Sequence, residues 1–402
     1  MKRFIVFFSG QSASLLGSEL VQFALIWWLT ANGGSATSLA TAALAGLLPT
    51  VVLGPFAGAI VDRRDRRTVM MVADGAIALA TLSLAFVFAA GTARPGHVYA
   101  ALFVRSLFGA FHWPAMQASV AALVSERNLS RAAGANQALR GIASIAMPPL
   151  GALLVSIAPI SAVLAIDIGT AVLAVATLAA VPIPRPAPVP GSGEPASLLS
   201  EMREGGRYVA RRPGLSILIV LIAALHFLAA PAFALVPVAA TRKFGGGPAA
   251  LAWLQSAAGF GMALGGLILG LWGGFRRRVV TVLVGIAAIG ACLLAFGALP
   301  QAAFVPAVAA VLGAGLSASM AVGSFQAIQQ AVVPPGLRGR VFALSRSGID
   351  AMSPLGLVAA GPLADRFGLD AWYLVTGVAM AVMAGAAFSV PKLMNLEKWS
   401  DE

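Results

Sequence analysis

The sequence predicts an all-α polytopic membrane protein, with twelve transmembrane helices in two six-helix bundles. Three observations predict it: the composition, the length of the apolar runs, and a long polar interruption near the middle of the chain. Of the 402 residues, 59% are hydrophobic and 10% are charged, whereas soluble domains carry about 25% charged residues. So few charges cannot form a water-facing surface, which excludes a soluble enzyme. The apolar residues form unbroken runs instead of alternating with polar ones, which excludes a transmembrane β-barrel.

Twelve apolar segments are each close to the about 20 residues that cross a bilayer as a helix. They span residues 4–29, 38–60, 69–90, 97–118, 134–157, 160–181, 215–240, 249–272, 279–299, 303–328, 341–363 and 370–391. The first segment follows Lys2 and Arg3 in the manner of a secretory signal. It continues to Leu29, however, which is too long for the apolar core of a signal peptide. We therefore interpret it as the first membrane span.

The longest polar interruption lies between the sixth and seventh segments, from Pro182 to Pro213. It begins with prolines at alternate positions and a Gly-Ser-Gly sequence, a composition typical of an extended linker. Leu198, Met202 and Val209 then recur at about helical spacing, which predicts a short amphipathic helix on the membrane surface. The predicted organisation is an N-terminal bundle over residues 1–181, a cytoplasmic linker over 182–213 and a C-terminal bundle over 214–402.

The distribution of basic residues predicts the orientation in the membrane. With the N-terminus inside, 21 of the 27 Lys and Arg residues fall on the inner side and four fall in outer loops. This imbalance follows the positive-inside rule, and it places both termini on the cytoplasmic side of a cytoplasmic (inner) membrane. The net charge of +12 is therefore explained by topology, and no nucleic-acid partner is expected.

The most specific motif is the charged loop Gly58–Arg67, between the second and third segments. It resembles the signature loop of the major facilitator superfamily, although Asp65 stands where that pattern has Gly. A carboxylate at such a turn can face a helix N-terminus, and arginines can face helix C-termini or other carboxylates. The alternative is an ordinary solvated positive-inside loop. We expect a conformational-gating role for these residues of the loop and its neighbourhood: Gly58, Asp62, Arg63, Arg66, Arg67 and Asp74.

Further stretches resemble one branch of this superfamily, the macrolide-efflux drug:proton antiporters. They are Gly10–Ser18, Arg105–Pro114, Ala165–Asp167, Glu201–Gly205 and Leu337–Phe342. The resemblance implies the major facilitator fold, alternating access between two bundles around a central cavity, and export powered by proton entry. It does not identify the substrate, because similar relatives export different hydrophobic compounds and siderophores.

Glu19, Arg105 and Asp167 are ionisable residues inside predicted spans, where a charge costs about 2.5–3.5 kcal/mol unless it has a partner or a role. A rise of about 1.5 Å per residue puts all three at similar depth in the N-terminal bundle. We expect Arg105 to be shared between the two carboxylates, at least one of which binds and releases protons during transport. The alternative is a permanent structural ion pair between Arg105 and Asp167.

In the second half, Arg346 and Asp350 are four residues apart, so they share a helix face and can pair locally. Asp350 is nevertheless a further proton-coupling candidate. His226 lies near mid-depth in the seventh segment, where it could titrate, bind substrate or simply pack. Three glutamines near the inner end of the tenth segment could line a vestibule: Gln326, Gln329 and Gln330.

If the resemblance holds, the first, fourth and seventh segments line the transport cavity, and aromatic rings there would suit a bulky hydrophobic substrate. The substrate-cavity candidates are Gln22, Phe23, Phe111, His112, Trp113, His226, Phe227 and Phe233. Two glycine pairs with a four-residue spacing, Gly54 with Gly58 and Gly261 with Gly265, should let helices approach closely.

The sequence contains no signature of catalysis. Its three His and one Cys are scattered, and it has no phosphate-cradling Gly-Lys-Ser/Thr loop. We therefore expect no enzyme activity, no cofactor and no metal. The predicted function is a secondary active exporter, acting as a monomer in the bilayer, that exchanges protons for a hydrophobic or amphiphilic compound of multidrug or macrolide type. The alternatives are an exporter of an endogenous metabolite such as a siderophore or lipid, and a non-transporting membrane sensor or scaffold.

Overall fold

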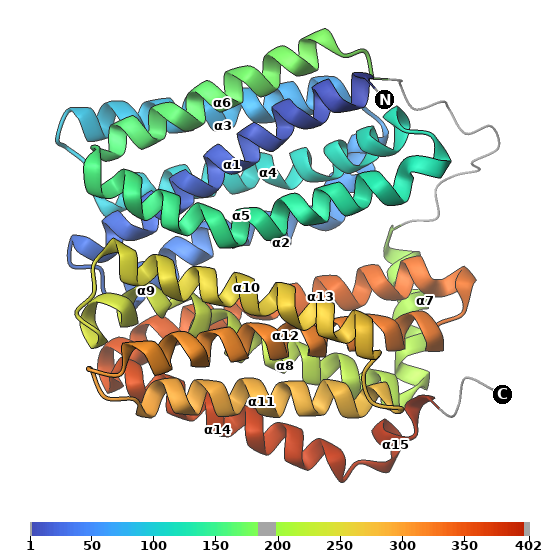
Figure 1. Ribbon diagram of the computed structural model, residues 1–402. Coiled ribbons are helices and arrows are strands. Elements are labelled where there is room, and N and C mark those ends of the chain that lie inside the picture. Colours follow the sequence, from blue (N-terminus) through green and yellow to red (C-terminus); the bar gives the residue numbers. More distant parts are fainter. Residues whose placement is uncertain (1, 184–197, 398–402) are drawn as a thin grey trace. The chain divides into compact units, whose positions relative to one another are not determined.

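The computed structural model describes residues 2–183 and 198–397, and every regular element in these two ranges is helical (Figure 1). Twelve of the helices described there have 20 residues or more, one for each predicted apolar segment. Ten are long and apolar enough to cross a membrane. The other two, α4 (Pro95–Leu123) and α13 (Arg338–Phe367), contain charged residues such as Arg105 and Arg346. The all-α prediction is confirmed.

The described residues form two compact units. The first contains α1 to α6 together with residues 240–242 and 246–256, and the second contains the rest of the chain from α7 onward. Helix α7 (Leu198–Arg211) lies where the sequence predicts a short amphipathic helix. The Pro-rich stretch 184–197 lies outside the described residues. The domain boundaries at residues 181 and 214, and the position of α7 on a membrane surface, stay predictions.

Short turns connect the helices of the first unit. These are α1 (Lys2–Ala31), α2 (Ala36–Asp62), α3 (Arg66–Ala89), α4, α5 (Leu129–Ile157) and α6 (Ile160–Ala180). Two turns carry side-chain caps: Ser35 accepts the backbone N–H of Ser38 at 3.1 Å, and Asp65 accepts that of Arg67 at 3.1 Å. Such caps satisfy N–H groups that a helix start leaves unpaired. Capping of α3 thus gives Asp65 a local role at the position where the signature pattern has glycine.

Helix α1 packs against α5 and α6, α3 lies between α4 and α6, and α2 packs against α4 (Figure 1). Glycines permit the close approach of α1 and α6, since a Cβ at Gly10 would collide with Thr177 and one at Gly17 with Thr170. The α1–α6 contact is what brings the middle of α1 next to Asp167.

The second unit is built from more irregular helices. They are α7, α8 (Pro213–Ala234), α9 (Val236–Val238), α11 (Arg278–Ala298), α12 (Phe304–Val332), α13, α14 (Leu369–Phe388) and α15 (Pro391–Met394). The π-helical turn (Ala239–Lys243) and α10 (Pro248–Trp272) are divided between the two units, with residues 240–242 and 248–256 in the first. Helix α11 packs between α12 and α14, and α8 packs against α13. The buried ammonium of Lys243 donates to the carbonyls of Phe296 and Gly297, at 3.0 and 2.7 Å, and to Asp370 Oδ1 at 2.6 Å. It thereby ties the C-terminus of α11 to the start of α14.

The two predicted glycine pairs behave differently. Gly261 and Gly265 on α10 lie directly against α12, where an added Cβ would meet backbone atoms of Leu312 and Leu316. The close-approach prediction is confirmed for this pair. It is wrong for Gly54 and Gly58 on α2, because an added Cβ there would have no described atom within 4 Å.

Candidate functional site

The first unit holds a buried ion pair at the predicted position. Nη1 of Arg105 on α4 lies 2.5 Å from Oδ2 of Asp167 on α6 and also donates to the hydroxyl of Thr81 on α3. Thr81 donates to the same carboxylate oxygen at 3.2 Å, and Ser18 on α1 donates to Oδ1 at 3.1 Å. Asp167 is 1% exposed. Four helices thus converge on one carboxylate whose two oxygens both have partners.

Glu19 lies near this cluster but is not part of it. Its charge interacts with that of Arg140 on α5 and, more weakly, with that of Arg105. The guanidinium of Arg140 lies over the ring of Trp113 on α4, 3.6 Å from its centroid, a cation–π arrangement. Arg140 is not among the site residues predicted from the sequence. The available signal was its position inside the fifth apolar segment, where an uncompensated charge is costly.

A second buried network involves the carboxylate of Asp74 on α3, which is 4% exposed. Nε2 of His112 on α4 lies 3.2 Å from Asp74 Oδ1 and 2.9 Å from Oε1 of Gln11 on α1. Both neighbours are acceptors, so Nε2 of His112 carries the proton. The Gln11 amide donates to Asp74 Oδ2 at 3.5 Å. His112 was expected in the substrate cavity and Asp74 beside the loop arginines; the structure instead joins them to each other within the bundle.

The arginines of the charged loop bind helix C-termini. Arg66 donates to the carbonyl of Ala118 near the end of α4 at 3.2 Å, and Arg67 donates to that of Ala179 near the end of α6 at 2.5 Å. Ala179 lies in the last turn of α6, where carbonyls lack partners within their own helix. Both arginines thus lie near the negative end of a helix dipole. Arg63 follows α2 as its cap residue. The side chain of Asp62 lies outside the described part of the structure, so its gating role stays a prediction.

The second unit contains a polar cavity of about 330 Å³ between α8, α12 and α13. It is lined by Ile222, His226, Val322, Phe325, Gln326, Gln329, Gln330, Phe342, Arg346, Ile349 and Asp350. Arg346 Nε donates to Asp350 Oδ2 at 3.0 Å, as the four-residue spacing predicts. Gln329 is 6% exposed, and its amide nitrogen has no hydrogen-bond partner among the described residues. A buried donor of this kind is costly unless something binds to it.

The other substrate-cavity candidates do not gather at one place. Phe23 is 3% exposed and packs on Gly151 of α5, and its assignment to the transport cavity stays a prediction. Phe111 borders a shallow hollow of about 380 Å³ that also includes Arg64 and Asp65. Gln22 is exposed on α1. The remaining two lie on α8: Phe227 is partly buried, and Phe233 borders a narrow space next to Tyr373.

Comparison with known proteins identifies the family to which this chain belongs. Residues 7–357 match the family model described as Major Facilitator Superfamily. The chain belongs to this superfamily. It is 35% identical to macrolide efflux protein A of Streptococcus pyogenes over 395 residues, covering 98% of this chain and 97% of that protein. It is also 27% identical to the multidrug efflux pump Tap of Mycolicibacterium fortuitum over 400 residues, covering 95% and 94% of the two chains.

Solved transporters share the fold of this superfamily member. The nucleoside transporter NupG matches with a TM-score of 0.68 at 15% identity, covering 94% of this chain and 97% of that chain. A D-xylose-proton symporter also matches with a TM-score of 0.68, at 14% identity and 96% and 99% coverage. At this identity the likeness concerns the fold alone. The predicted major facilitator fold is confirmed, and the chain is a multi-pass membrane protein.

Proposed function

We propose that this chain is a secondary active exporter that works by alternating access and exchanges protons for a hydrophobic or amphiphilic compound. Similarity to proteins named macrolide efflux protein A and multidrug efflux pump Tap supports export of such compounds. We place it in the cytoplasmic membrane as a monomer with both termini in the cytoplasm. The observation that carries proton coupling is the contrast between Glu19, a carboxylate on α1 whose charge interacts with those of Arg140 and Arg105, and Asp167, whose two oxygens both accept hydrogen bonds.

Glu19 is the proton carrier in this proposal. When ionised, its carboxylate attracts Arg140 and Arg105; when it binds a proton, that attraction disappears. Arg140 also lies over Trp113, so protonation of Glu19 changes the forces that α1, α4 and α5 exert on one another. A proton can in this way bias one of two arrangements of the helices, as coupling requires.

Asp167 has a positioning role in this proposal. Its oxygens hold Arg105, Thr81 and Ser18, and protonating it would take from the buried guanidinium the counter-charge to which it is hydrogen-bonded. Arg105 is thereby kept within reach of Glu19. This assignment favours Glu19 over Asp167 and Asp350 among the three candidate carriers.

The cavity of the second unit is the proposed substrate site. The unbonded amide nitrogen of Gln329 offers a hydrogen bond to an acceptor oxygen, and Ile222 and Phe325 offer apolar contact. Ligand sites commonly combine apolar walls with a few placed polar groups. A macrolide presents ester, ketone and hydroxyl oxygens on a large apolar ring, which matches both features.

Transport into inverted membrane vesicles tests this function. A radiolabelled macrolide should accumulate in energised vesicles that contain the protein, and a protonophore should abolish accumulation. Vesicles without the protein provide the background. Accumulation that persists with the protonophore, or no accumulation of either the macrolide or a lipophilic cation, would contradict proton-driven export.

A further inference from the structure

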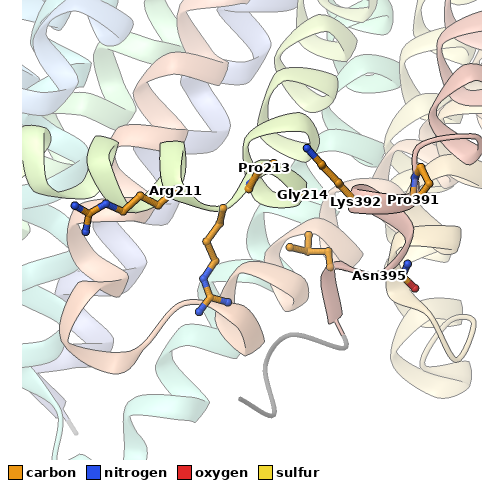
Figure 2. A pocket seen from close by; sticks show the side chains of 8 residues that line it. Arg211, Pro213, Gly214, Pro391, Lys392 and Asn395 are labelled. Atoms are coloured by element: carbon orange, nitrogen blue, oxygen red, sulfur yellow. The ribbon is translucent and has the colours of Figure 1, made fainter.

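A cavity of about 490 Å³ lies at the junction of α7 and α8, away from the polar cavity described above (Figure 2). It is lined by Arg211, Arg212, Pro213, Gly214, Pro391, Lys392, Asn395 and Leu396. Three of these eight residues are basic, one is an amide, and none is acidic. The composition therefore combines a cationic rim with a largely apolar wall.

Direct contacts build the cavity and hold its walls in place. Arg212 lies between α7 and α8, Pro213 begins α8, and the hydroxyl of Ser216 donates to the carbonyl of Val209 at 2.6 Å across the junction. The short helix α15 packs on the start of α8, because an added Cβ at Gly214 would collide with the carbonyl oxygen of Lys392. Leu396 is 4% exposed beneath it. The space is thus a formed site between packed elements.

Further contacts anchor α7 to the rest of the second unit. Tyr208 donates to the carbonyl of Val332 at 3.0 Å, and Arg340 pairs with Glu204 at 2.6 Å. Arg211 therefore projects from a helix that is fixed at two points upstream. Lys392, on the opposite side of the cavity, comes from α15 (Figure 2).

We infer that this cavity binds the phosphate headgroup of an anionic phospholipid. Helix α8 begins at the cavity and is the first part of a segment long and apolar enough to span the membrane, so the site lies at the depth of the lipid headgroups. The positive-inside rule puts this end on the cytoplasmic face, where anionic headgroups attract basic residues by about 1 kcal/mol each.

The apolar wall favours a lipid over a soluble phosphate. Pro213 and Pro391, which are exposed, offer contact to the glycerol and upper acyl region, and Val220, further along α8, is 66% exposed on the membrane-spanning helix. A free anion would gain nothing from these surfaces. The start of α8 has no acidic residue in its first turn, so the helix dipole adds to the attraction exerted by the basic side chains.

The test measures binding of dioctanoyl-phosphatidylglycerol to the purified full-length protein in neutral detergent, by the rise in its melting temperature. Dioctanoyl-phosphatidylcholine and inorganic phosphate are the comparison ligands. The cavity variant is Arg211→Gln with Lys392→Gln. A matched control, Arg203→Gln with Arg207→Gln, removes the same charge from exposed positions of α7 that do not line the cavity.

Phosphatidylglycerol should raise the melting temperature in a saturable way, as a ligand of the folded state does, and the comparison ligands should not. The cavity variant should weaken apparent affinity by about thirtyfold, since it removes two basic residues, and the control should stay within about twofold. Equal loss in both variants, or an equal response to phosphatidylcholine or inorganic phosphate, would overturn the proposal. Tight binding only after Asp401→Asn with Glu402→Gln would also overturn it, because the acidic chain end would then be the occupant.

Discussion

Each unit contains an arginine–aspartate ion pair, and the two pairs differ in almost every physical respect. Arg105 and Asp167 come from different helices, with side chains 11% and 2% exposed, and share hydrogen bonds with two hydroxyls. Arg346 and Asp350 come from one turn of α13, with side chains 76% and 37% exposed, and face a cavity. Burial sets the effect of each pair on stability. Removing one partner of a buried pair is strongly destabilising, whereas an exposed pair contributes little to stability.

The contrast extends to the surrounding polar groups. In the first unit, Asp74, His112 and Gln11 satisfy one another inside the bundle. In the second unit, Gln329 is buried beside a cavity with a donor left unbonded. We therefore propose that proton coupling belongs to the first unit and substrate recognition to the second.

The largest expected effect comes from Asp167→Asn. This variant removes the counter-charge to which the buried Arg105 guanidinium is hydrogen-bonded, which costs about 3–5 kcal/mol, and we expect a strong fall in the melting temperature of the purified protein. Asp350→Asn is the matched control, and the loss of its exposed pair should cost about 0–1 kcal/mol. Equal melting temperatures for the two variants would remove the basis of the comparison.

Glycine substitutions at helix contacts should have an intermediate effect on stability. Gly265→Ala places a Cβ against the backbone of Leu316, so α10 and α12 must separate, at a cost of about 1–3 kcal/mol. Gly54→Ala, on α2, meets no described atom within 4 Å, and it should leave stability the same or slightly higher. Thermal unfolding in detergent distinguishes the two, and a larger loss for the α2 variant would contradict the packing described for both helices.

A smaller effect is expected from Gln329→Leu. The change replaces the amide with an apolar side chain of similar size. The protein should therefore still fold, and one hydrogen bond to the substrate should be lost. A bond of about 0.5–1.5 kcal/mol corresponds to a roughly two- to tenfold rise in the apparent KM for a macrolide. Gln330→Leu is the control, because its side chain is exposed at the same cavity. A larger effect in the control would move the recognition site away from Gln329.

Several features could be predicted from the sequence because they depend on local spacing or on depth. Twelve apolar runs predict the helices, the i,i+4 spacing predicts the Arg346–Asp350 pair, and helical rise places Arg105 level with Asp167. Each of these follows from distance along one helix axis, which the sequence specifies directly.

Other features depend on which helix faces meet, and the sequence does not specify this. The glycine pairs on α2 and α10 have identical spacing, yet only the second packs on a neighbour. Phe23 and Phe111 have similar chemistry, yet α5 covers the first. The Asp74–His112–Gln11 network joins three helices, and Arg140 meets Trp113 only after α4 and α5 are placed. These contacts follow from tertiary packing.

Proton-gradient-driven uptake by Glu19→Gln, measured together with macrolide binding to the same purified variant, tests the division between the units most directly. We expect Glu19→Gln to bind the macrolide as the wild type does, while its gradient-driven uptake falls at least about tenfold. Asp350→Asn should retain uptake. Unchanged gradient-driven uptake in Glu19→Gln would contradict the account and leave Asp167 or Asp350 as the proton carrier. Loss of uptake in Asp350→Asn alone would also contradict it and place proton coupling in the second unit.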